Sequence, residues 1–103
     1  MAYKIILSDA ADHDIDEILT YIAEKLANPQ AAANLADELE KRYTDLENHP
    51  LMYGLSKNVR LAKMGYHRFV VGSYVALYQV DEEQCIVTIS RIFYGKREYV
   101  RYL

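Results

Sequence analysis

The stretch YHRFVVGSYVALYQV, residues 66–80, decides the fold. Two runs of β-branched and aromatic residues flank Gly72-Ser73, and glycine at the first of two turn positions is typical of a type II′ hairpin. A two-residue loop also determines which residues face each other across the two strands. The predicted pairs are Val71 with Tyr74, Phe69 with Ala76, and His67 with Tyr78.

This register separates the hairpin into two faces, both largely apolar. The first face is expected to pack on helices; it carries His67, Phe69, Val71, Tyr74, Ala76, Tyr78 and Val80. The second face carries Tyr66, Arg68, Val70, Val75, Leu77 and Gln79. An exposed antiparallel face normally alternates to polar residues, and contiguous exposed apolar area usually marks a partner site. We therefore predict that a partner covers the second face; the alternative is that the C-terminal tail folds back over it. The predicted partner contacts are Tyr66, Val70, Val75 and Leu77.

The N-terminal half predicts one strand and two helices. Residues 2–7 (AYKIIL) are typical of a strand. Ser8-Asp9 offers an N-cap, and the apolar residues that follow at helical spacing predict a helix over about residues 9–26. Asn28-Pro29 ends this helix and begins the next, which stops before His49-Pro50. Because the link is very short, we expect an antiparallel helical hairpin.

The remaining segments complete the predicted topology. Residues 51–65 are expected to form a basic loop with a short extended piece around residues 59–61. A turn at residues 81–83 precedes a long strand over residues 84–94, which Gly95 ends before a basic tail. The order β-α-α-β-β-β predicts a single α+β domain over residues 1–103, with a two-helix hairpin packed on one face of an antiparallel β-sheet.

Composition narrows the class of protein. The chain has 103 residues and no apolar run near the roughly 18 residues of a membrane span. Its N-terminus lacks a signal-peptide pattern. The single cysteine, Cys85, favours a reducing cytoplasm, and we expect it to be a small core residue of a strand.

The net charge of −3 hides an asymmetry between the two halves. Residues 1–56 carry 4 cations and 11 acids, whereas residues 57–103 carry 8 cations and 4 acids. This separation predicts a local basic surface, with ordinary solvation of exposed faces as the alternative.

Few residues have the pattern of a catalytic or metal site. Arg91 alternates with apolar residues, so its head group needs a partner, and a buried ion pair with a helix carboxylate is the favoured interpretation. His67 lies on the predicted core face and is expected to be a hydrogen-bonded core histidine. His13 and His49 lack companions at metal-binding spacing, and no metal or other cofactor is predicted.

Three segments of the second half carry a family pattern: residues 74–81 (YVALYQVD), 87–92 (VTISRI) and 94–99 (YGKREY). Together with the helix that ends before Pro50 and the order of the elements, they resemble the RelE/ParE toxin superfamily of bacterial toxin–antitoxin modules. The resemblance covers essentially the whole chain. It implies a cytoplasmic toxin that a cognate antitoxin neutralises by wrapping it, in a toxin–antitoxin hetero-oligomer.

The resemblance implies two possible targets. RelE-like members cleave mRNA in the ribosomal A site without a metal. In that reaction a ribose 2′-OH attacks the adjacent phosphate, which requires a group to take the proton, cations to stabilise charge and an acid for the leaving oxygen. ParE-like members bind and poison DNA gyrase and hydrolyse nothing. We expect action on translation, with gyrase inhibition and a non-toxic interaction module of the same fold as alternatives.

The resemblance also assigns roles to single residues. Arg97 matches the family's phosphate-stabilising arginine, and Arg68 falls near a lysine of the catalytic sheet face. The key arginine two residues before Leu77 is replaced by Val75, and the position of the C-terminal catalytic tyrosine is Leu103. The candidate catalytic residues are Arg97, Arg68, Tyr99 and Tyr102, and the candidate contacts with RNA or another target are Lys63, Arg91, Lys96 and Arg101.

Overall fold

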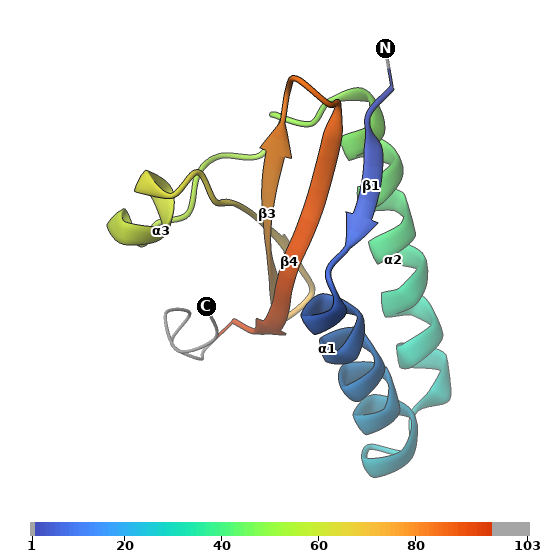
Figure 1. Cartoon of the computed structure of the whole chain (residues 1–103). Coiled ribbons are helices and arrows are strands. Elements are labelled where there is room, and N and C mark those ends of the chain that lie inside the picture. The colour runs from blue at the N-terminus through green and yellow to red at the C-terminus, as the bar shows by residue number, and fades with distance from the viewer. Residues whose placement is uncertain (1, 96–103) are drawn as a thin grey trace.

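The computed structural model of the chain describes residues 2–95 (Figure 1). Along this range the elements are β1 (Lys4–Leu7), α1 (Asp9–Thr20), the π-helix η1 (Tyr21–Lys25), α2 (Pro29–Asn48), α3 (Val59–Lys63), β2 (His67–Val71), β3 (Tyr74–Asp81) and β4 (Ile86–Tyr94). The strands of residues 2–95 form one four-stranded sheet in the order β1-β4-β3-β2. Figure 1 shows α1 and α2 on one side of this sheet and α3 on the other. The predicted α+β class is confirmed.

The central hairpin has the predicted register. The paired residues are Val71 and Tyr74, Phe69 and Ala76, and His67 and Tyr78. Gly72 has a φ of +56°, in the left-handed region that glycine adopts without steric cost. The turn residues therefore determine which side chains of β2 and β3 reach the core.

The sheet is mixed rather than antiparallel, because β1 lies parallel to β4. Lys4 pairs with Ile86, and Leu7 pairs with Ile89. The expectation of an entirely antiparallel sheet was therefore wrong for β1, although β2, β3 and β4 are antiparallel as predicted. No short turn links β1 to its neighbour, so local sequence patterns contain no signal for the direction of this pairing.

The helices begin where their capping residues predict. The Ser8 hydroxyl accepts a hydrogen bond from the Ala11 amide at 3.0 Å, and the Asn28 side chain accepts one from the Ala31 amide at 3.1 Å. Pro29 occupies the first turn of α2, which ends at Asn48 as expected. The first predicted helix is divided into α1 and η1. No helix within residues 2–95 is long and apolar enough to cross a membrane.

The main core lies between the helical hairpin and the sheet. From the helices it includes Ala11, Leu39 and Leu46, and from the sheet Phe69, Val71, Ala76, Tyr78, Val87, Ile89 and Ile92. Complete burial of a large apolar side chain contributes about 1.5–3 kcal/mol to folding. The first hairpin face therefore packs on the helices, as its pattern predicts.

The second sheet face carries its own core under α3, where a loop with an extended piece had been expected. Leu61 of α3 is 1% exposed and packs in a cluster with Val75, Leu77 and Phe93. The expectation that Val75 and Leu77 lie exposed for a partner was therefore wrong. Asn58 caps this five-residue helix, which is too short to show a helical period in the sequence.

Two residues that are not glycine have left-handed backbone conformations. Ala27, which follows η1, has a φ of 49°, and Cys85, in the turn before β4, has a φ of 56°. Cys85 is half-buried in that turn, so the expectation of a core residue within a strand was wrong.

Replacement of Ala27 by glycine is expected to stabilise the fold. A Cβ costs roughly 1–2 kcal/mol in the left-handed region, and the greater freedom of glycine in the unfolded chain removes about half of that gain. Urea denaturation is expected to show a rise of about 0.5–1 kcal/mol in the free energy of unfolding for Ala27→Gly. Ala33→Gly, at an exposed position inside α2, is the matched control and is expected to lower stability by about 1 kcal/mol. Equal losses in the two variants would contradict the strain at Ala27.

Candidate functional site

The Arg91 side chain of β4 forms an ion pair with Asp14 of α1. Its Nε and Nη2 atoms donate to the two carboxylate oxygens of Asp14 at 2.7 and 2.9 Å. The same carboxylate accepts a hydrogen bond from the Ile92 amide at 3.0 Å. The predicted ion pair with a helix carboxylate is confirmed. The Arg91 guanidinium group therefore helps to hold α1 against β4.

Ser8 and Asp14 supply hydrogen-bond partners to the edge of β4 beyond the point where β1 ends. Beyond Leu7, the Ser8 amide donates to the Ile89 carbonyl at 3.0 Å, and the Ser8 hydroxyl donates to the Ser90 carbonyl at 2.8 Å. Asp14 then accepts from the next outward amide, that of Ile92. Buried backbone groups require such partners, so the start of α1 is held against β4 by hydrogen bonds as well as by apolar packing.

The segment before α3 is anchored to β2 and β3 by polar contacts. The Tyr78 hydroxyl donates to the Pro50 carbonyl at 3.1 Å. His67 Nδ1 lies 2.9 Å from the Tyr53 carbonyl, and its ring stacks on Tyr78 with centroids 5.1 Å apart. His67 is thus hydrogen-bonded and packed on the first sheet face as predicted, but it is half-buried and not part of the buried core. These contacts set the position from which α3 crosses the second sheet face.

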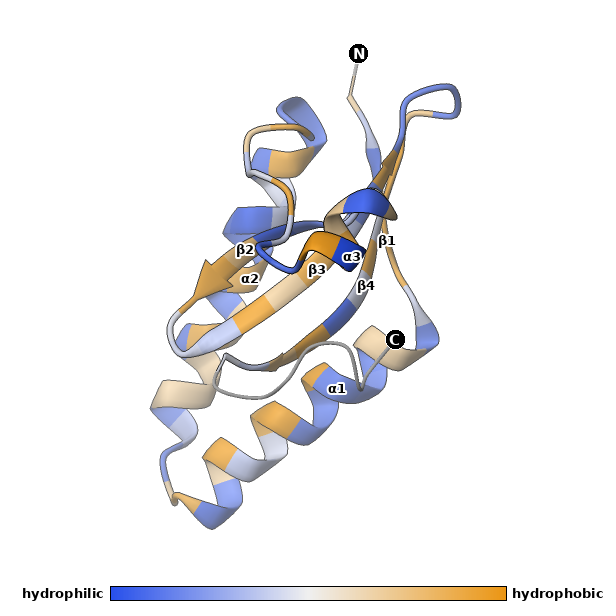
Figure 2. Cartoon of the chain, turned by 90° about the vertical axis from the view of Figure 1, so that its left-hand side faces the viewer, coloured by the Kyte–Doolittle hydropathy of each residue, from blue (hydrophilic) through white to orange (hydrophobic). Residues whose placement is uncertain are grey.

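A basic surface surrounds α3. Lys57, Arg60 and Lys63 are exposed, and Arg68 on β2 is half-buried with an Nε atom that has no hydrogen-bond partner. The sequence contains no acidic residue between Glu47 and Asp81. Figure 2 shows strongly hydrophilic and hydrophobic residues side by side on α3. Lys63 and Arg68 had been predicted as functional residues, whereas Lys57 and Arg60 had not.

Several predicted site residues lie outside the described range, namely Lys96, Arg97, Tyr99, Arg101 and Tyr102. Their proposed roles therefore stay predictions. Within residues 2–95, Val75 stands where the resemblance places a key arginine, and its side chain is only 3% exposed. Of the predicted partner contacts, Val70 is 44% exposed and Tyr66 is half-buried.

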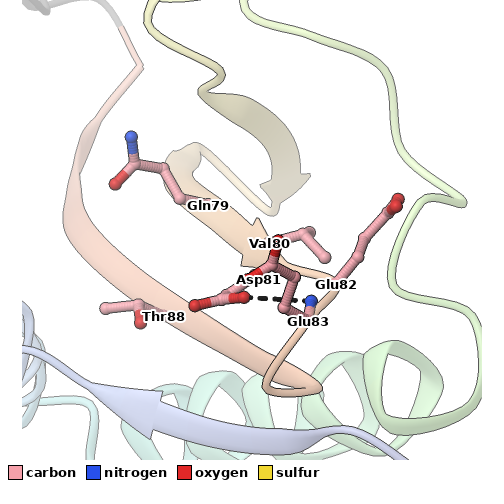
Figure 3. Close-up of a pocket in the computed structure, with 6 residues that line it drawn as sticks. All are labelled: Gln79, Val80, Asp81, Glu82, Glu83 and Thr88. Atoms are coloured by element: carbon pink, nitrogen blue, oxygen red, sulfur yellow. Dashed lines mark hydrogen bonds between the residues drawn. The ribbon is translucent and has the colours of Figure 1, made fainter.

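A shallow hollow lies at the turn between β3 and β4 (Figure 3). It is lined by Gln79, Val80, Asp81, Glu82, Glu83 and Thr88. Asp81 closes the turn, because its carboxylate accepts hydrogen bonds from the amides of Glu83 and Gln84 at 3.1 and 3.0 Å. No group of three or more histidine, cysteine or acidic side chains among the described residues is arranged to hold a metal ion. The acidic side chains of this hollow form a solvated turn.

Comparison with solved structures shows that the fold is that of RelE and ParE toxins. A structure of the chromosomal ParDE system from P. aeruginosa matches with a TM-score of 0.72 and 16% identity, over 92% of this chain and 98% of that one. The RelBE2 toxin–antitoxin complex from Mycobacterium tuberculosis matches with a TM-score of 0.64 and 21% identity, over 91% and 99%. A free mutant E. coli RelE toxin matches with a TM-score of 0.68 and 14% identity, over 98% and 92%.

The family follows from the sequence match. Residues 5–99 match the family described as ParE toxin of type II toxin–antitoxin system, parDE. The chain therefore belongs to the ParE toxin family and is the toxin of a type II toxin–antitoxin system. No curated protein sequence matches the chain.

Loss of the Asp14 carboxylate is expected to destabilise the fold strongly. Asp14→Ala removes the carboxylate that binds the Arg91 guanidinium group and the Ile92 amide, and removal of one member of a buried pair costs about 3–5 kcal/mol. Asp14→Asn is expected to cost less, because the amide oxygen still accepts from Ile92. Asp16→Asn, two residues along the exposed face of α1, is the control and is expected to change stability by less than about 0.5 kcal/mol. Urea denaturation that gives the same midpoint for all three variants would refute the role of Asp14.

Alkaline pH is expected to weaken the fold through two buried tyrosines. Burial raises the pKa of Tyr78 to about 12, and burial likewise raises the pKa of Tyr43 to about 12. Because both groups hold their protons more tightly in the folded state, their contribution to stability is complete below pH 10 and is lost as the pH rises to about 12. The free energy of unfolding should therefore fall between about pH 10 and pH 12, and less so in Tyr43→Phe. Tyr21→Phe, at an exposed position, is the control and should retain the full fall.

Proposed function

We propose that this toxin arrests growth by binding DNA gyrase in the manner of ParE, without cleaving RNA, and that a cognate antitoxin neutralises it. The observation that supports this choice is the burial of Val75. A valine that is 3% exposed beneath Leu61 offers no hydrogen bond to a phosphate, where the RelE-like pattern has an arginine. This proposal replaces the sequence-based expectation of mRNA cleavage as the first choice.

The other described cations support the same choice. RNA cleavage through the 2′-OH needs several cations around one phosphate, together with groups that take up and return a proton. Arg91 is engaged by Asp14, so Lys63 and Arg68 are the predicted functional cations that remain available within residues 2–95. A surface of this kind suits binding to a large target, because separated cations and exposed apolar side chains provide affinity without assembling a reaction centre.

Ribosome-dependent mRNA cleavage is the competing function. Arg68 lies on the sheet side that carries α3 and is half-buried, so its guanidinium group is a candidate contact for a phosphate, although its Nε atom is buried and has no hydrogen-bond partner. With Arg97, Tyr99 and Tyr102 it would form the set that the resemblance implies. Both functions place the toxin in the cytoplasm, in a complex with its antitoxin.

Expression of the toxin without antitoxin separates these functions. We expect growth arrest, inhibition of gyrase supercoiling by the purified toxin, and intact mRNA in the arrested cells. Normal supercoiling at saturating toxin, combined with mRNA cut at ribosomal A sites, would refute gyrase binding and support the RelE-like reaction. In that case Arg97→Ala and Arg68→Ala should abolish cleavage, whereas Lys41→Ala on the exposed side of α2 should not. Absence of growth arrest would indicate a non-toxic interaction module.

A further inference from the structure

The tip of the helical hairpin has two backbone irregularities. At η1 the Leu26 amide donates to the Tyr21 carbonyl at 3.1 Å, which closes a wider turn than that of an α-helix. Ala27, the next residue, has the left-handed backbone described above. Single π turns and left-handed residues other than glycine are both frequent at functional sites. Figure 1 shows this tip, where α1 leads through η1 into α2, projecting beyond the end of the sheet.

The tip exposes two large apolar side chains and a cation. Tyr21 is 53% exposed, and Leu26 is 56% exposed. Lys25 is exposed and forms no ion pair with another residue of the described range. Since residues four positions apart lie on the same side of a helix, the side chains of Tyr21 and Lys25 point in the same direction. An aromatic ring and a cation therefore project together from this surface.

A groove lies beside the tip, between α2 and the turn that joins β2 to β3. Its volume is about 280 Å³, and its lining is mostly apolar, with Ile22, Leu35, Val71 and Tyr74 among the lining residues and Glu38 as the acidic one. Pockets that hold drug-sized ligands have volumes of about 300–1,000 Å³, so this groove suits a single large side chain.

Tyr21 lies close to the rim of this groove. Burial raises the pKa of Tyr74, and the nearby Tyr21 and Tyr94 hydroxyl groups raise that pKa further. Tyr74 lines the groove, and its ring meets that of Tyr94 edge-on with centroids 6.0 Å apart. The projecting ring and the groove that could receive such a ring therefore belong to one patch.

A patch that carries both a projection and a matching groove can pair with itself. In a two-fold symmetric dimer, each copy presents the same patch to the other. The axis reverses the direction along the helices. Lys25 lies nearer the tip than Tyr21, whereas Glu38 lies farther from the tip than Leu35, because α2 runs away from the tip. When Tyr21 of one copy enters the groove of the other, its Lys25 is thus directed toward Glu38 of the second copy.

Glu38 is able to accept this cation. Its carboxylate lies 3.4 Å from Lys41 Nζ, but the side chains of Lys41 and Glu38 are 71% and 48% exposed. An exposed pair of this kind contributes little to stability, so it does not compete strongly with a second cation. The contact between Lys25 and Glu38 occurs twice in a two-fold dimer, which makes the two patches complementary in charge as well as in shape.

We propose that the toxin forms a two-fold symmetric dimer, in which Tyr21 of each copy fills the groove between α2 and the β2–β3 turn of the other copy and Lys25 pairs with Glu38. This surface lies on the helical side of the sheet, opposite to α3 (Figure 1). The inference does not depend on the target of the toxin. Because a contact built around one groove is at the small end of specific interfaces, we expect a dissociation constant on the order of 10 µM.

Two other occupants fit the patch less well. A small ligand would fill the groove but would leave Tyr21, Lys25 and Leu26 without partners. A nucleic acid would meet Glu38 and the acid excess of residues 1–56, which carry 11 acids and 4 cations, and its phosphates need cations instead. A second copy of the chain uses the groove, the ring and both charges.

A charge exchange tests the pairing of Lys25 with Glu38. In sedimentation equilibrium, the mass of the purified toxin is expected to rise from one chain to two as its concentration passes the dissociation constant. Lys25→Glu places like charges against each other at both contacts and should weaken the dimer about tenfold or more, as should Glu38→Lys. The double variant, with Lys25→Glu and Glu38→Lys, restores opposite charges and should dimerise nearly as well as the unchanged toxin.

Removal of the projecting ring tests the groove. Tyr21→Ala is expected to weaken the dimer at least about thirtyfold, the effect of losing an aromatic side chain at the centre of an interface. The substitution is at an exposed position, so the fold tolerates it. Val59→Ala on α3, where the side chain is 68% exposed, is the matched control and should leave the dimer unchanged.

A third measurement needs no variant. Amide NMR signals of the unchanged toxin should shift with concentration in residues 21–26, 34–38 and 73–74, which form the tip and the groove. The signals of α3 should not shift.

Several results would overturn the proposal. They are a single-chain mass at all concentrations, an undiminished dimer in Tyr21→Ala, and a charge-exchanged double variant that associates no better than the single ones. Concentration-dependent shifts confined to α3 or Val70 would place a dimer contact elsewhere. Shifts at the groove that occur only when purified gyrase is added would assign the groove to the target. Because the readouts are mass and NMR shifts, failure of gyrase inhibition would leave the dimer unaffected.

Discussion

The structure depends on how the edge of β4 is completed where β1 ends. A buried strand edge requires partners for its amides and carbonyls, and β1 supplies them only as far as Ile89. Ser8, which caps the first helix, and Asp14, in the middle of α1, provide the next ones. A buried carboxylate also needs a counter-ion, which Arg91 supplies from β4 itself. The orientation of α1 on the sheet is therefore determined by directional bonds, and the helical hairpin and its core follow from it.

The sequence predicts the parts of this fold whose signals are local. Gly72-Ser73 determines the register of β2 and β3, and Ser8 and Asn28 mark the helix starts, because turn and cap chemistry acts over three or four residues. The need of Arg91 for a carboxylate follows from its position among apolar residues, but the choice of Asp14 among the acids of α1 depends on how the helix lies on the sheet. The parallel pairing of β1 is likewise a long-range property that no local pattern encodes.

The second sheet face shows how a short element changes a functional interpretation. Its apolar pattern correctly indicates that something covers Val75 and Leu77, but the cover is Leu61 from within the same chain. A five-residue helix leaves too few apolar positions for periodicity, although Asn58 followed by Leu61 is a capping signal that would locate it. Of the candidate site, sequence resemblance located the substitution at Val75 and the cations Lys63 and Arg68. That Lys57 and Arg60 belong to the same basic surface follows from the presence of α3, which the structure shows and the sequence analysis did not predict.

The parallel contact between β1 and β4 also has a consequence for the newly made chain. Ser8 and Ser90, which meet at the end of this contact, are 82 residues apart, so the first strand acquires its neighbour only after β4 has left the ribosome. Until then the apolar groups of β1 and the inner side of α1 lack the surface on which they pack, and pairings across such long loops form slowly. Synthesis of the last strand thus sets the moment at which the toxin acquires its native form, and an antitoxin already present in the cell can meet it as it folds.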